Sequence, residues 1–231
     1  MTESERQLRA NIQEFSVLVK KVAKNPKSKD IHELRILSRK FRAALWIVER
    51  VSKNAIPKGL KKELRTLGKK LGTCRELDVL LKDTKTYNLK DKNSEKSLKK
   101  ELQDLQRFLD KSFSRKLQKK LESFLSKIHG IVLPKKDLVV QIKKGIIKWP
   151  QQMPEGKKDL HNIRIETKKM IYRLEFLGIQ MPTLKALQKS LGRTHDLESL
   201  KKSAGSHKEL DLDLKALRKK AEPTYKRIIA S

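Results

Sequence analysis

Apolar residues recur every three or four positions along most of the chain, which is the period of an amphipathic α-helix. The pattern predicts an all-α fold and contains no strand-like alternation of any length. Eight helices are expected, at about 4–24, 31–54, 57–84, 94–128, 135–149, 157–177, 182–202 and 208–229. Pro223 is expected to bend or shorten the last of them.

The stretch IVLPKK at residues 131–136 is the best boundary inside the chain, because Pro134 cannot continue a helix. It separates four predicted helices in residues 1–130 from four in residues 135–231. We expect each half to form a four-helix bundle and the two halves to make up one domain.

Residues 31–50 carry two stripes when they are wound as a helix. One stripe is apolar and should face a core. The other holds His32, Arg35, Arg39 and Arg42 in a row, which suits an anion. In a single helix, such a row is more simply interpreted as a solvated basic face.

The basic pattern occurs a second time. HELRILSRK, which begins at His32, matches HNIRIETKK, which begins at His161, 129 residues later. LGTCRELDVL, which begins at Leu71, matches LGRTHDLESL, which begins at Leu191, 120 residues later. The matched basic pairs are Arg35 and Arg164, Arg39 and Lys168, Lys40 and Lys169, Lys69 and Lys189, and Arg75 and His195. A solvated face has no reason to repeat this register, so the pattern favours a duplicated four-helix unit with an anion-binding surface.

The charge balance points the same way. The 231 residues include 57 Lys and Arg against 27 Asp and Glu, a net charge of +30. A polyanionic partner would relieve the resulting self-repulsion, which leaves nucleic acid, an anionic membrane or inorganic polyphosphate. Cys74 is the only cysteine, which favours a reducing compartment. With no signal-peptide pattern and no apolar run near the ~20 residues of a membrane span, we expect a soluble, cytoplasmic protein.

The repeated motifs H-x-x-R-[VI]-x-x-[RK]-[RK] and L-G-x-x-[RH]-[DE]-L, in this order, resemble those of the CHAD family, the conserved histidine α-helical domain. The resemblance covers essentially the whole chain. It implies two four-helix bundles with pseudo-twofold symmetry, a basic central groove, binding of inorganic polyphosphate and no catalysis. Association with polyphosphate granules in the cytoplasm would follow. One position departs from the family: Ile171 stands where a third basic residue is usual, and Arg173 lies one step further round the helix.

Polyphosphate offers one charge per phosphate and no bases, so guanidinium forks and long ammonium side chains suit it. The expected binding residues are His32, Arg35, Arg39, Lys40, Arg42, Lys69, Arg75, His161, Arg164, Lys168, Lys169, Tyr172, Arg173, Lys189 and His195. The histidines either donate to phosphate oxygens or orient the arginines, and both interpretations stay open. Acidic residues beside the motifs should hold the basic side chains by ion pairing; these are Glu76, Asp78, Asp196 and Glu198. Phosphate or sulfate ions could occupy the same positions.

Two other interpretations compete with this one. His195-Asp196 resembles the metal dyad of phosphohydrolases, but the matching pair is Arg75-Glu76, and arginine does not ligate a metal. We therefore expect no catalytic residue, metal or cofactor. Sequence-independent nucleic-acid binding by the same surface is the more serious alternative. Against it, 5% aromatic residues leave few stacking platforms, and no helix-turn-helix or zinc pattern occurs. The sequence leaves the oligomeric state open.

Overall fold

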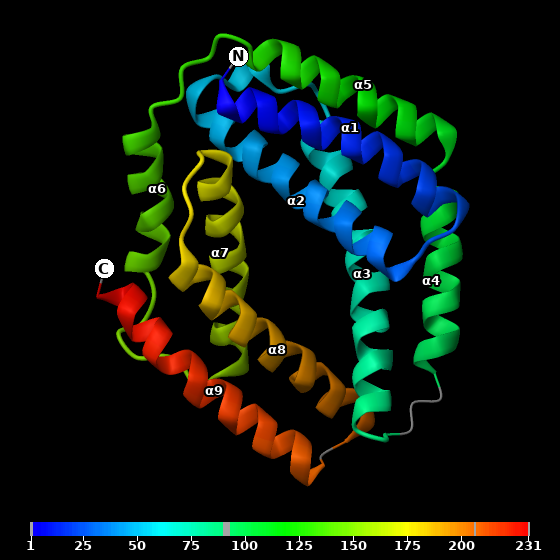
Figure 1. Cartoon of the computed structure of the whole chain (residues 1–231), viewed down its shortest axis with the longest axis vertical. Coiled ribbons are helices and arrows are strands. Elements are labelled where there is room, and N and C mark those ends of the chain that lie inside the picture. The colour runs from blue at the N-terminus through cyan, green and yellow to red at the C-terminus, as the bar shows by residue number, and fades with distance from the viewer. Residues whose placement is uncertain (1, 90–92, 206, 231) are drawn as a thin grey trace. The chain divides into compact units, whose positions relative to one another are not determined.

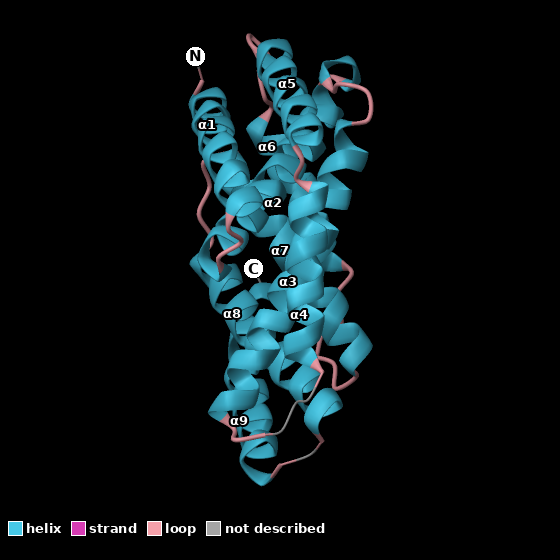
Figure 2. Cartoon of the chain, turned by 90° about the vertical axis from the view of Figure 1, so that its right-hand side faces the viewer, coloured by secondary structure: helices cyan, strands magenta, loops and turns pink. Residues whose placement is uncertain are grey.

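The structure is a computed structural model that describes residues 2–89, 93–205 and 207–230. Helices joined by loops and turns make up these residues, which contain no strand (Figure 2). The described helices are α1 (Glu3–Lys24), α2 (Ser28–Val51), the short 3-10 helix η1 (Lys53–Ala55), α3 (Leu60–Thr86), α4 (Ser94–Phe108), α5 (Lys111–Ile128), α6 (Lys135–Ile147), α7 (Lys157–Phe176), α8 (Pro182–Ala204) and α9 (Lys208–Ile229). The predicted all-α class is confirmed. None of the helices in the described ranges is long and apolar enough to cross a membrane.

The prediction of one long helix at 94–128 is wrong, because α4 ends at Phe108 and α5 begins at Lys111. The carboxylate of Asp110 accepts a hydrogen bond from the backbone N–H of Phe113 at 2.6 Å, so it caps α5 and fixes the break. Leu109, inside the break, is buried. The leucine spacing therefore runs across the break, and periodicity alone could not reveal it.

Pro223 does not shorten the last helix, since α9 runs from Lys208 to Ile229, the predicted bounds. The alternative that Pro223 bends the helix stays a prediction. Proline removes the hydrogen bond to the carbonyl of residue i−4, here Lys219. Both Pro223 and Lys219 are exposed, so water can solvate that carbonyl. Pro182 opens α8, and Gly130 and Gly178 follow α5 and α7 with positive φ of +79°.

The chain divides into two compact units. Unit 1 comprises Met1–Asp78, Glu95–Pro134 and Phe176–Gly178, and unit 2 comprises Val79–Ser94, Lys135–Glu175 and Ile179–Ser231. The end of α3 thus groups with unit 2 although it precedes Pro134. The duplication and its twofold symmetry stay predictions.

In unit 1, α1 packs beside both α2 and α5 (Figure 1). The apolar stripe predicted for residues 31–50 is buried in this core, with Leu34, Leu37 and Phe41 at most 1% exposed. Phe41 meets Phe15 of α1 edge to face, with ring centroids 5.6 Å apart. Burial of this stripe turns the basic side of α2 away from the core.

In unit 2, α8 lies along α9, as Figure 1 shows. Leu197 and Leu200 of α8 share a buried cluster with Leu210 of α9 and Tyr87 at the end of the α3 segment. The Tyr87 hydroxyl donates a hydrogen bond to the Asp213 carboxylate of α9. This core fixes the orientation of α8, which carries the second copy of the L-G-x-x-[RH]-[DE]-L motif.

Candidate anion-binding site

Four of the predicted residues from the first half gather in unit 1. His32, Arg35 and Arg39 come from α2, and Arg75 comes from α3. Burial lowers the pKa of His32 below its usual 6.5, and the positive charges of Arg75, Arg35 and Arg39 lower the pKa further. All three arginines therefore act on the imidazole at short range. We call these four residues the first cluster.

Carboxylates hold two arginines of the first cluster. Arg35 Nη2 lies 3.9 Å from Glu76 Oε1, and the Arg35 side chain is only 15% exposed. Arg75 Nη1 donates to Asp78 Oδ2 at 2.5 Å, and the same oxygen accepts from Ser28 Oγ at 2.7 Å. The predicted ion pairing by Glu76 and Asp78 is thus confirmed. It orients the guanidinium groups in advance, which lowers the entropic cost of binding an anion.

Four residues from the second half gather in unit 2. His161, Arg164 and Lys168 come from α7, and His195 comes from α8. The two imidazole rings lie 5.1 Å apart between centroids. Burial lowers the pKa of His195 to about 4, helped by the charges of Arg164, His161 and Lys168. We call these four residues the second cluster.

The second cluster repeats the ion pair of the first. Arg164 Nη2 lies 4.0 Å from Asp196 Oδ1, and Arg164 and Asp196 match Arg35 and Glu76 in the repeat. Burial raises the pKa of Asp196, while the Arg164 charge opposes that rise. The clusters differ in charge at neutral pH: the first has three guanidinium groups, whereas His195 stands neutral where the first has Arg75.

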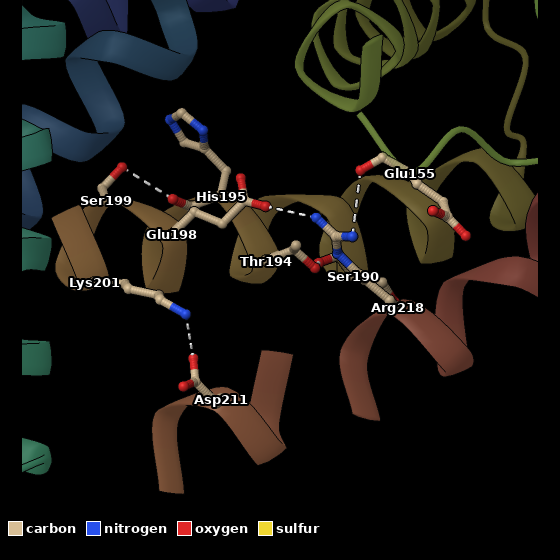
Figure 3. Close-up of polar contacts among 9 residues, drawn as sticks. All are labelled: Glu155, Ser190, Thr194, His195, Glu198, Ser199, Lys201, Asp211 and Arg218. Carbon is tan, nitrogen blue, oxygen red and sulfur yellow. Dashed lines mark hydrogen bonds and ion pairs between the residues drawn. The ribbon is translucent and has the colours of Figure 1, made fainter. Parts of the chain in front are cut away.

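Two ion pairs fix α8 against α9. Arg218 of α9 pairs with Glu198 at 2.9 Å, and Lys201 pairs with Asp211 of α9 at 2.6 Å. Glu198 thus holds a basic residue, as predicted, but that residue belongs to another helix. Figure 3 shows the Lys201–Asp211 pair between α8 and α9, and the His195 ring on the side of α8 away from Asp211. The His195 ring is directed toward α7, where its centroid lies 5.1 Å from that of His161.

Two glycines of α3 lie beneath the arginines of α2. A Cβ atom at Gly72 would lie 3.9 Å from Arg35 Nε, and one at Gly68 would lie 3.5 Å from Arg42 Cζ. These glycines were not among the predicted site residues. Their spacing of four residues places them on one face of the helix that follows the basic stripe, and this spacing was the sequence signal that could have identified them.

The second half differs at the positions that match Arg42 and Gly68, where it has Ile171 and Gln188. Both line a cleft of about 370 Å³ in unit 2. The lining residues are Lys168, Ile171, Tyr172, Glu175, Lys185, Gln188 and Lys189. The structure thus brings the predicted residues Lys168, Tyr172 and Lys189 together. Lys185 and Gln188 were missed, and Lys185 pairs with Glu175 at 2.8 Å.

Five predicted residues lie outside the two clusters and outside the cleft. Lys40 donates to Asn11 Oδ1 of α1 at 3.4 Å, and Lys169 pairs with Glu166 of its own helix at 2.5 Å. Arg42 donates from Nε to the Ser38 carbonyl at 3.3 Å. Lys69 is exposed on α3, and Arg173 is partly buried on α7 without lining the cleft. Lys40 and Lys169 therefore have partners outside the clusters.

The single cysteine and the metal-ligating residue types remain to be placed. Cys74 is buried, and burial raises the pKa of its thiol to about 11, which suits a packing residue. In the part of the chain that the structure describes, no three His, Cys, Asp or Glu side chains are grouped so that they could hold a metal ion.

Comparison with known proteins shows similarity to CHAD domains. The family model of the CHAD domain matches residues 6–204. The crystal structure of the CHAD domain from the plant Ricinus communis is similar, with a TM-score of 0.67 and 20% sequence identity. That match covers 92% of this chain and 83% of the plant chain, and at this identity it supports the fold alone. Comparison with curated proteins gives no match.

Proposed function

The chain belongs to the CHAD domain family, which is associated with polyphosphate binding, and from this premise we propose that it binds inorganic polyphosphate. The proposed ligand contacts are the first cluster in unit 1 and the second cluster in unit 2. The observation that carries the proposal is the ion pair that occurs in both: Arg35 with Glu76 at 3.9 Å and Arg164 with Asp196 at 4.0 Å.

The chemistry of the clusters suits a chain of phosphates. Guanidinium groups bind phosphate oxygens through paired N–H donors, and ammonium groups add charge without a fixed direction. A neutral imidazole still donates one N–H, so His32 and His195 can contact phosphate oxygens without carrying charge. The lysine-lined cleft beside the second cluster extends the cationic surface along α7.

We propose binding without catalysis, because the clusters contribute guanidinium, ammonium and imidazole groups, and Arg35 and Arg164 each pair with one carboxylate. The basic groove between the two halves, which the family resemblance implies, stays a prediction. The proposal rests on each cluster by itself. Its setting, the cytoplasm with its polyphosphate granules, belongs to the same proposal.

Paired alanine variants test the first cluster. Replacing both Arg35 and Arg39 by alanine should weaken the binding of long-chain polyphosphate at least tenfold, about 1.4 kcal/mol. The matched control replaces Lys99 and Lys100 by alanine. Both lysines are exposed on α4, and their replacement removes the same amount of charge. The control should change the dissociation constant less than twofold, and both variants should keep the helical circular dichroism. Equal losses in both variants would mean that net charge, rather than the cluster, binds the ligand.

A second pair of variants tests the difference between the clusters. Replacing Arg164 and Lys168 by alanine should also weaken binding, but by less than the loss of Arg35 and Arg39. The reason is that the first cluster carries more charge at neutral pH. A larger loss from the second pair would contradict this assignment.

A further inference from the structure

A cleft in unit 1 lies outside both clusters and has a different chemistry. It has a volume of about 470 Å³, within the usual range for small-molecule sites. Side chains from α1, from α5 and from Leu109 in the break before α5 line the cleft, and α1 and α5 lie side by side in Figure 1. The lining residues are Phe15, Ser16, Val19, Lys20, Ala23, Lys24, Leu109, Lys111, Ser114, Arg115 and Gln118.

The floor of the cleft is apolar. Phe15, Val19 and Ala23 recur every four residues along α1 and therefore share one face of that helix. Leu109 completes the floor from the break between α4 and α5. The two serines are satisfied locally, since Ser16 Oγ donates to the Ile12 carbonyl and Ser114 Oγ to the Leu109 carbonyl, both at 3.3 Å.

The rim of the cleft is cationic. Lys20 and Lys24 stand on α1, and Lys111 and Arg115 stand on α5. Among the described residues, no carboxylate lies within ion-pair distance of these four, and none of the lining residues is acidic. Four uncompensated cations around an apolar floor favour a ligand that has both an apolar body and a negative charge.

The backbone around the cleft is fixed. Gln106 of α4 donates from Nε2 to the carbonyls of Ala23 at 3.1 Å and Lys24 at 3.3 Å, which ties the end of α4 to the end of α1. The Asp110 carboxylate is occupied at the N-terminus of α5, where it accepts from the Phe113 N–H. The shape of the cleft is therefore set before any ligand arrives, which favours binding.

We propose that this cleft binds a small amphipathic anion, a single aliphatic or aromatic body that carries one carboxylate, sulfonate or phosphate. The apolar body lies on Phe15, Val19 and Ala23. The anionic group meets the rim cations Lys24 and Arg115. This site is separate from the polyphosphate clusters and takes a different class of ligand.

The probe is 8-anilinonaphthalene-1-sulfonate, an aromatic sulfonate that reports binding to apolar surface. Its uncharged counterpart, N-phenyl-1-naphthylamine, has the same rings without the sulfonate. We expect saturable binding of one sulfonate probe per chain, at least tenfold tighter than the uncharged probe. Dodecanoate below its micelle concentration should displace it. Equal affinity for the two probes would overturn the role of the rim, and failure of dodecanoate to compete would overturn the ligand class.

Variants locate the binding. Ala23→Phe should fill the cleft, and Lys24→Glu with Arg115→Glu should reverse the rim; each should weaken probe binding at least tenfold. The control, Lys99→Glu with Lys100→Glu, changes the charge equally and should leave affinity within twofold. The rim variant alters only exposed side chains, so it tests the site even if Ala23→Phe unfolds the protein. Unchanged binding in the rim variant would overturn the proposal.

Excess polyphosphate separates this site from the proposed function. It should leave the probe bound, and the rim variant should bind polyphosphate within threefold of the parent protein. Displacement of the probe by polyphosphate would place it at the clusters and overturn the separate site. Loss of polyphosphate binding from Arg35 and Arg39 variants should in turn leave the probe bound.

Discussion

Replacing Gly72 by alanine should stabilise the protein, whereas the same replacement at Gly68 should not. Both glycines lie inside α3, four residues apart. The loss of unfolded-chain entropy and the gain in helix propensity are therefore nearly the same for both variants. Any difference between them isolates how closely α2 packs on α3 at each position.

The magnitudes follow from the contacts of the added methyl group. At Gly72 it would meet Arg35 Nε at 3.9 Å, an ordinary contact, so most of the ~0.8–1 kcal/mol of helix propensity should appear as stability. At Gly68 it would lie 3.2 Å from Ser38 Oγ and 3.5 Å from Arg42 Cζ. Ser38 is fully buried and cannot move easily, so overpacking of about 1–3 kcal/mol should cancel or exceed the gain.

Urea denaturation measures both variants against the parent protein. We expect the free energy of unfolding to rise by about 0.5–1 kcal/mol for Gly72→Ala and to stay equal or fall for Gly68→Ala. Gly192→Ala in α8 is a control in which the added methyl group does not contact α2, because it would meet only Gln188 of the same helix, at 3.9 Å. It should resemble Gly72→Ala. Equal changes at Gly68 and Gly72, within about 0.3 kcal/mol, would refute the close packing of Ser38 and Arg42 on α3.

Three further results are expected. Asp110→Ala should lower the free energy of unfolding by about 1 kcal/mol through loss of the α5 cap, and Asp110→Asn should retain most of it; equal losses would contradict the capping role. Tyr87→Phe removes the hydroxyl that donates a hydrogen bond to the Asp213 carboxylate, so it should lower the free energy of unfolding by about 1 kcal/mol in the same assay. No loss would show that this hydrogen bond makes no net contribution to stability. His195 has a pKa near 6.5 unfolded and about 4 folded, so the unfolded chain binds its proton more tightly. Stability should therefore fall as the pH drops from about 6.5 to 4, and His195→Gln should reduce this fall; an identical pH profile would contradict the shift.

Much of the fold could be predicted from apolar spacing, because a helix that buries one face shows it at every turn. The stripe that includes Leu34, Leu37 and Phe41 is buried as predicted. The division between α4 and α5 could not be predicted this way. It depends on one side chain, Asp110, that accepts a backbone hydrogen bond while the buried leucines on either side keep their spacing.

The core of each cluster could be predicted because the repeat placed its residues in one register twice. Arg35 and Arg164 even retain matching carboxylate partners. The limits of the site could not be predicted. Lys40 turns to Asn11 of α1, which only the packing of α1 on α2 brings within reach.

The cleft beside the second cluster shows the same limit. Lys185 and Gln188 line it because α8 packs beside α7, and no short motif includes them. The departure at Ile171 was visible in the sequence, but its consequence was not. Ile171 is buried in the cleft wall. Gln188, which occupies the position in the second half that matches Gly68, lines the same cleft.

Competition between polyanions tests the central claim most directly. Labelled long-chain polyphosphate is bound to the protein at moderate salt, and unlabelled polyphosphate, single-stranded DNA and double-stranded DNA are added at equal total charge. Sequence-independent nucleic-acid binding depends on the same electrostatic term, so equal charge makes the comparison fair. Our account predicts that polyphosphate competes at least tenfold better than either DNA. Equal competition by DNA would contradict it and would favour a general nucleic-acid-binding surface.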